Sequence, residues 1–207
     1  MNYRCFPVGA LATNCYLLWD QQGNALLIDP GDNASALLQS LKAEGLTLRA
    51  ILLTHVHFDH MLAIPELQKA TGAPLWVPHA DAAAINDPTV SLSSWMQGPP
   101  PVFPTPERTF EEGDVLSVGD LSLTVLHTPG HTLGSSCFLA EDLLFSGDTL
   151  FAESVGRTDF PGGNFQVLMQ SLQRLLALPP ETTVLPGHEE PTTIGHEQQY
   201  NPYIRRM

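Results

Sequence analysis

Residues 55–60 read His55-Val56-His57-Phe58-Asp59-His60, which places three imidazoles and one carboxylate within six positions. This cluster follows an apolar run at residues 50–53, which is typical of a short buried strand. Side chains that leave one strand end and the turn after it converge on a small volume. Without a cation, protonated imidazoles there would repel one another, and buried nitrogens would need other partners. The pattern therefore predicts a metal site, because imidazole and carboxylate are ligands of zinc and other first-row metals.

Three later segments share one arrangement, in which a metal-binding side chain directly follows a glycine after an apolar run. Glycine and proline form tight turns at such positions, so the next side chain projects from the edge of the sheet. Each segment alone is typical of an ordinary turn. Together with the histidine cluster, they predict one site built from several strand ends. The segments are Thr128-Pro129-Gly130-His131, Phe145-Ser146-Gly147-Asp148 and Leu185-Pro186-Gly187-His188.

The rest of the chain alternates strand and helix patterns, which favours an α/β fold with helices on the outer faces of sheets. Residues 87–106 are rich in Pro, Ser and Gly, and predict a long surface loop that either covers the substrate or packs on the core. Apolar runs predict strands at 16–19, 25–28, 50–53, 75–77, 115–118, 121–126, 136–139, 143–145 and 183–185. Helical spacing predicts helices at 33–44, 62–70, 81–85 and 167–176.

These motifs resemble those of the metallo-β-lactamase superfamily, and within it those of the glyoxalase II-like branch, the hydroxyacylglutathione hydrolases. The resemblance spans nearly the whole chain and implies the four-layer αββα metallo-β-lactamase sandwich, with the site at one edge. The segments that carry it are Asn14-Cys15-Tyr16, Ile28-Asp29-Pro30-Gly31 and residues 54–60, 127–132, 145–151 and 156–161.

The resemblance also implies a centre of two divalent metal ions. Zinc is the expected metal, and iron or manganese would suit the same ligands. One ion would be held by His55, His57 and His131, the other by Asp59, His60 and His188, with Asp148 bridging both.

The reaction implied by this resemblance is hydrolysis of a thioester such as S-lactoylglutathione. Two cations roughly 3.5–4 Å apart lower the pKa of a shared water and polarise the substrate carbonyl. We expect Asp59 to orient or deprotonate that water as well as bind metal, and Arg157 to contact the substrate. Asp29 matches a residue that the family uses to fix a ligand imidazole, although an ordinary Asp-Pro-Gly turn explains it equally well.

Full-length glyoxalase II enzymes carry a C-terminal helical domain that contacts glutathione. This chain ends about twenty residues after His188 and is therefore similar to the short bacterial form. Where the family often has a Tyr, Glu189 and Glu190 follow His188. Acidic groups at that place weaken the expectation of selectivity for glutathione.

Two other functions fit the same motifs. Persulfide dioxygenases of this fold bind a single iron through residues that match His55, His131 and Asp148. The Pro-Gly-Gly sequence at 161–163 is more similar to the hydrolases. A metal-binding protein without turnover is the other alternative, and the retention of all seven ligand positions argues against it. A β-lactamase is not expected, because no export signal is evident.

The composition indicates a globular protein with one domain spanning residues 1–207. A formal net charge of −13 disfavours nucleic acid and anionic membrane surfaces as partners. The three cysteines, Cys5, Cys15 and Cys137, show no disulfide or metal-ligand spacing. We expect a cytoplasmic enzyme that acts on a small-molecule thioester, and nothing in the sequence requires a partner chain.

Overall fold

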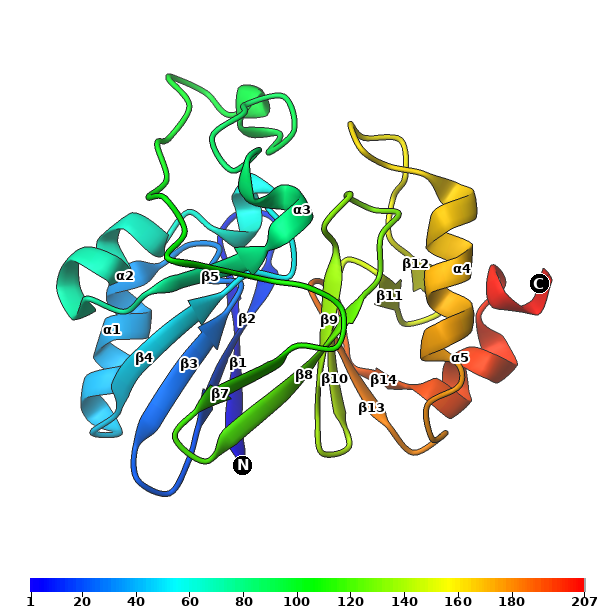
Figure 1. Cartoon of the computed structure of the whole chain (residues 1–207), viewed down its shortest axis with the longest axis horizontal. Coiled ribbons are helices and arrows are strands. Elements are labelled where there is room, and N and C mark those ends of the chain that lie inside the picture. Colours follow the sequence, from blue (N-terminus) through cyan, green and yellow to red (C-terminus); the bar gives the residue numbers. More distant parts are fainter. Residues whose placement is uncertain (207) are drawn as a thin grey trace.

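The computed structural model describes residues 1–206 and contains two six-stranded sheets packed face to face (Figure 1). Helices α1 (Ala34–Ala43) and α2 (Ile64–Thr71) cover the outer face of the first sheet. Helices α4 (Phe165–Leu175) and α5 (Ile194–Tyr200) cover the outer face of the second. The expected αββα sandwich is confirmed.

The first sheet has the strand order β1-β2-β3-β4-β5-β6, antiparallel from β1 to β3 and parallel from β3 onward. Its strands are β1 (Asn2–Val8), β2 (Thr13–Trp19), β3 (Asn24–Ile28), β4 (Thr47–Leu52), β5 (Leu75–Pro78) and β6 (Arg108–Phe110). A short helix, α3 (His79–Ala82), follows β5.

The second sheet has the order β14-β13-β10-β9-β8-β7, in which β10 and β13 are parallel and the other pairs antiparallel. Its strands are β7 (Val115–Val118), β8 (Leu121–His127), β9 (Ser136–Ala140), β10 (Leu143–Gly147), β13 (Thr183–Pro186) and β14 (Thr192–Thr193). A small separate ribbon pairs β11 (Leu150–Phe151) with β12 (Ser154–Val155).

Alternation along the central strands divides the core into layers. In β2, Tyr16 and Leu18 belong to the layer between the two sheets, whereas Cys15 and Leu17 belong to the layer beneath α1 and α2. Both faces of such a strand are buried, which explains why it reads as a continuous apolar run.

All nine predicted strands and four predicted helices are present, with ends that differ by at most three residues. Strands β2 and β4 each begin three residues before the predicted start, and the short helix predicted at 81–85 lies at His79–Ala82. Strands β1, β6, β11, β12 and β14 and helix α5 were not predicted. Strand β1 lies at a sheet edge and is exposed along most of its length, so it has no apolar run to reveal it.

The predicted loop at 87–106 carries only a 3-10 turn, and Ser91, Leu92 and Phe103 are buried, so parts of it pack on the core. Among the described residues, no helix is long and apolar enough to cross a membrane.

The strands set two distinct ends of the sandwich. Strands β3, β4, β8, β10 and β13 all finish at one edge, the upper one in Figure 1, which we call the site end. The tight turns that join β2 to β3, β7 to β8 and β9 to β10 lie at the opposite edge, the turn end. Side chains that follow the first set of strands therefore meet.

Candidate metal centre

The structure brings all seven predicted ligands together at the site end. His55 and His57 come directly after β4, and His131 lies in the loop after β8. The Nδ1 atom of His57 is 3.1 Å from Nε2 of His55 and 2.9 Å from Nε2 of His131. These three nitrogens form a compact group that could hold one metal ion.

A second group lies beside the first. Asp59 Oδ2 is 3.6 Å from His60 Nε2 and 3.3 Å from His188 Nε2. Asp148, at the end of β10, lies between the two groups: its carboxylate oxygens are 3.4 Å from His60 Nε2 and 3.5 Å from His131 Nε2. This is the arrangement expected of a carboxylate that bridges two cations.

Unsatisfied polar atoms show that the residues fit such cations. Within residues 1–206, three buried side-chain atoms have no hydrogen-bond partner, namely His57 Nε2, His60 Nε2 and Asp148 Oδ1. All three belong to this cluster. A buried polar atom without a partner is costly. A cation placed between His60 and Asp148 would give a partner to both His60 Nε2 and Asp148 Oδ1.

The protonation states suit metal binding. Burial lowers the pKa of His55 well below its usual value and that of His57 to about 3. Both imidazoles are therefore uncharged, and each can offer a nitrogen lone pair to a metal ion. Burial alone would raise the pKa of Asp148, but His60 and His131 outweigh it and lower this pKa well below normal. Burial likewise opposes protonation of His60, yet Asp59, Asp148 and Asp29 raise its pKa, so a metal ion would replace a proton there.

Each of three ligand imidazoles is fixed through its other nitrogen. His60 Nδ1 lies 3.0 Å from Asp29 Oδ2, and His55 Nδ1 lies 3.0 Å from the Thr54 hydroxyl. His131 Nδ1 lies 2.7 Å from the carbonyl oxygen of Arg157. Asp29 also accepts hydrogen bonds from Thr54 N and Oγ1 and has a left-handed φ of 52°. The structure therefore favours the imidazole-fixing role of Asp29 over an ordinary turn.

Asp81 supports the loop that carries His131, and the sequence analysis did not single it out. It is buried in α3 and accepts hydrogen bonds from Thr132 Oγ1 at 2.8 Å and from Gly134 N at 2.7 Å. Its only sequence signal is a carboxylate within an Ala-rich segment.

Two glycines are required by close packing at the centre. A Cβ atom on Gly187 would collide with Asp148 Oδ1 and with the ring of His60. A Cβ atom on Gly31 would overlap the carbonyl oxygen of Asp59. Both glycines allow backbone to approach the ligands more closely than any other residue permits.

A cavity of about 570 Å³ opens beside the metal cluster. Arg157, predicted to bind substrate, lines it, as does Glu189. His79, His127 and His196, which were not assigned to the site, lie outside it. The apolar side chains of the cavity were not predicted, because they come from several separate segments of the chain: Leu11, Phe58, Leu92, Trp95, Phe151 and Phe160.

The sequence profile of the metallo-β-lactamase superfamily matches residues 8–188. The chain belongs to this superfamily. Hydroxyacylglutathione hydrolase GloC of Haemophilus influenzae is 35% identical over 99% of this chain and 98% of GloC. This relative supports the predicted resemblance to the glyoxalase II-like branch.

Three solved structures of the superfamily are also similar. The BLEG-1 B3 metallo-β-lactamase is 38% identical, with a TM-score of 0.93 over 98% of this chain and 99% of BLEG-1. TTHA1623, solved in a di-iron-bound form, is 40% identical, with a TM-score of 0.86 over 97% of this chain and 99% of TTHA1623. ETHE1 from Myxococcus xanthus is 34% identical, with a TM-score of 0.83 over 98% of this chain and 84% of ETHE1. The superfamily and the ligand cluster together identify a metal-dependent enzyme.

Proposed function

We propose that this protein hydrolyses thioesters, such as S-lactoylglutathione, with two divalent metal ions. The observation that carries the proposal is the pair of three-residue ligand groups with Asp148 between them. His55, His57 and His131 would hold one ion, and Asp59, His60 and His188 the other. Zinc suits these ligands, and so do iron and manganese. The two irons of TTHA1623 make iron a serious choice.

Two bound cations would supply an activated water and polarise the substrate carbonyl. Asp59 is the residue of this chain suited to orient that water. Burial would raise the pKa of Asp59, but His60 and His188 outweigh it and lower this pKa, so its carboxylate is ionised. Thr13 Oγ1 donates to Asp59 Oδ2 at 3.0 Å and fixes its direction. Asp59 can then accept a proton from the water as it attacks, and a departing thiolate needs no strong acid.

The first test combines elemental analysis with a hydrolysis assay on the same purified sample. We expect about two metal ions per chain and turnover of S-lactoylglutathione after reconstitution with zinc, iron or manganese. Two bound ions without turnover of any thioester in a panel would contradict the proposal and indicate a metal-binding protein without this activity.

A second candidate is a persulfide dioxygenase with one iron, favoured by the similarity to ETHE1. It would use His55, His131 and Asp148 and leave the second ligand group without a metal. One iron per chain, oxygen uptake with a glutathione persulfide and no thioester turnover would establish it. A β-lactam belongs in the same panel because BLEG-1 is similar over the whole chain.

A further inference from the structure

We propose that the cavity beside the metal cluster selects thioesters whose thiol portion is uncharged and apolar, and that Asp159 disfavours thiols that carry carboxylates. This inference rests on the proposed function, since it concerns the substrate of the same site. It names a specificity-determining residue that the ligand motifs do not include.

The only Lys or Arg side chain that lines the cavity already has a partner. Arg157 Nε donates to Asp159 Oδ1 at 3.0 Å, and Arg157 Nη2 donates to Asp159 Oδ2 at 2.7 Å. The same guanidinium lies over the Phe160 ring, 4.2 Å from its centroid. A substrate carboxylate would have to displace Asp159, which is two residues away on the same chain and therefore present at high effective concentration.

Apart from the ligand imidazoles, the other ionisable side chains that line the cavity are carboxylates. Asp59 and Asp148 belong to the metal cluster, and Glu189 lines the same cavity outside it. Among residues 1–205, Glu189 forms no ion pair. With Arg157 paired to Asp159, no other Lys or Arg lines the cavity to offset Glu189, and the net charge of −13 adds to the repulsion of an anionic thiol.

We place the thiol portion of a substrate against the apolar wall formed by Trp95 and Phe160, which line the cavity. Trp95 is 63% exposed and meets Phe160 edge to face, with the ring centroids 5.3 Å apart. Its position is set by the buried residues Ser91 and Leu92, because Ser91 accepts a hydrogen bond from Phe58 N at 2.8 Å. An apolar thiol group on this wall would remove the exposed Trp95 ring from water, which favours binding.

The test measures binding of two thioethers that cannot be hydrolysed, S-benzylglutathione and S-benzyl-N-acetylcysteamine. Both carry the same benzyl group, but only the first carries carboxylates. Isothermal titration with the metal-loaded protein should show tighter binding of the neutral thioether, by about fivefold or more. Asp159→Asn frees Arg157 to bind a carboxylate of S-benzylglutathione. The dissociation constant of S-benzylglutathione divided by that of the neutral thioether should therefore fall by about two- to fivefold, the scale of an exposed ion pair.

Asp142→Asn is the matched control, because it removes the same charge in the turn between β9 and β10, at the far end of the sandwich. It should leave the ratio of dissociation constants unchanged. Trp95→Ala should weaken both probes. Tighter binding of S-benzylglutathione to the wild type, or an unchanged ratio in Asp159→Asn, would overturn the inference.

Thioester turnover separates this inference from the proposed function. If the binding ratios behave as expected but no thioester is hydrolysed, the proposed function fails and the selectivity of the cavity stands. If thioesters are hydrolysed but the glutathione ester is preferred by kcat/KM over a matched N-acetylcysteamine ester, the selectivity fails and the hydrolase stands.

Discussion

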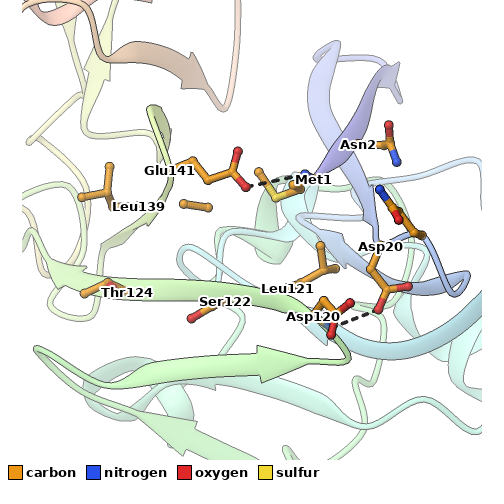
Figure 2. A pocket seen from close by; sticks show the side chains of 11 residues that line it. Met1, Asn2, Asp20, Asp120, Leu121, Ser122, Thr124, Leu139 and Glu141 are labelled. Atoms are coloured by element: carbon orange, nitrogen blue, oxygen red, sulfur yellow. Dashed lines mark hydrogen bonds and ion pairs between the residues drawn. The ribbon is translucent and has the colours of Figure 1, made fainter.

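Two aspartates at opposite ends of the sandwich show how differently a carboxylate can be used. Asp20, at the turn end, accepts hydrogen bonds from Gln22 N, Asn24 N and Asn24 Nδ2. It also accepts one from Asp120 N, which is drawn in Figure 2. Asp148, at the site end, is surrounded by imidazoles, and its Oδ1 has no hydrogen-bond partner among the described residues. A buried carboxylate whose oxygens accept hydrogen bonds from N–H groups stabilises the fold. One that faces only other metal-binding side chains needs a cation as its partner.

The cavities at the two ends give the same lesson. The turn end has a cavity of about 800 Å³, larger than the one at the site end. Figure 2 shows two of its three carboxylates already paired, Asp20 with Asp120 N and Glu141 with the amino group of Met1, the latter at 3.5 Å. No imidazole lines it. Size therefore does not mark the functional site, and unsatisfied ligand atoms do.

Asp148→Ala is the change with the largest expected effect. It removes the carboxylate shared by both ligand groups, so bound metal should fall below one ion per chain. Thioester turnover should fall on the order of 10²–10³-fold, the scale of losing one group that stabilises developing charge. Elemental analysis and kcat/KM on one sample measure both effects.

His188→Ala provides the comparison, because it removes a ligand of one group only and should lose mainly the second ion. Full metal content and activity in Asp148→Ala would show that this carboxylate does not bridge two ions.

Asp29→Asn should have the next largest effect. The amide has one acceptor oxygen and cannot accept from Thr54 N, Thr54 Oγ1 and His60 together as the carboxylate does, so the imidazole of His60 loses its fixed orientation. Affinity for the ion at Asp59, His60 and His188 should fall about 10–100-fold, measured by competition with a metal chelator. Unchanged affinity for both ions would return Asp29 to the role of a turn residue.

Asp81→Ala should have a smaller effect than Asp29→Asn, and it should weaken the other of the two metal ions. It leaves Gly134 N without its acceptor and loosens the loop that carries His131. Affinity for the ion at His55, His57 and His131 should fall about tenfold, with less effect on the other ion. The same chelator competition measures it, and equal weakening of both ions would indicate general unfolding instead.

The ligands could be predicted from the sequence because four of them cluster in residues 55–60, shortly after β4, and the other three directly follow a glycine near a strand end. Parallel pairing of β3 with β4 and of β10 with β13 brings those ends to one edge, so local patterns were enough. Asp29 could only be half predicted. Its neighbours Thr54 and His60 are 25 and 31 residues away, and an Asp-Pro-Gly turn has the same local sequence.

The supporting residues were not predictable because they depend on distant contacts. Asp81 meets Thr132 across 51 residues. Trp95 reaches Phe160 only because residues 87–106 pack on the core in one particular path. No local periodicity or motif in the sequence indicates that these residues lie near the site.

Asp20 offers the smallest effect and the sharpest contrast with Asp148. Burial would raise the pKa of Asp20, but hydrogen bonds from Asn24, Asp120 and Gln22 outweigh it and lower this pKa to about 2. An unfolded Asp has a pKa of about 3.9, so the native state favours the carboxylate. Its contribution to stability is therefore complete above about pH 4 and is lost as the pH falls from about 4 toward 2.

Asp20→Asn should lower the Tm of the chelator-treated protein by roughly 2–4 °C at pH 6. The difference from the wild type should shrink as the pH falls below 4, because the unfolded wild-type chain then takes up a proton at Asp20 that the native state, with its lower pKa, does not. Metal content and kcat/KM should match the wild type, since Asp20 lies at the turn end. Calorimetric scans at pH 6, 5, 4 and 3.5 test this, and a Tm difference that stays constant across that series would mean that Asp20 stabilises the turns by its shape and not by its charge.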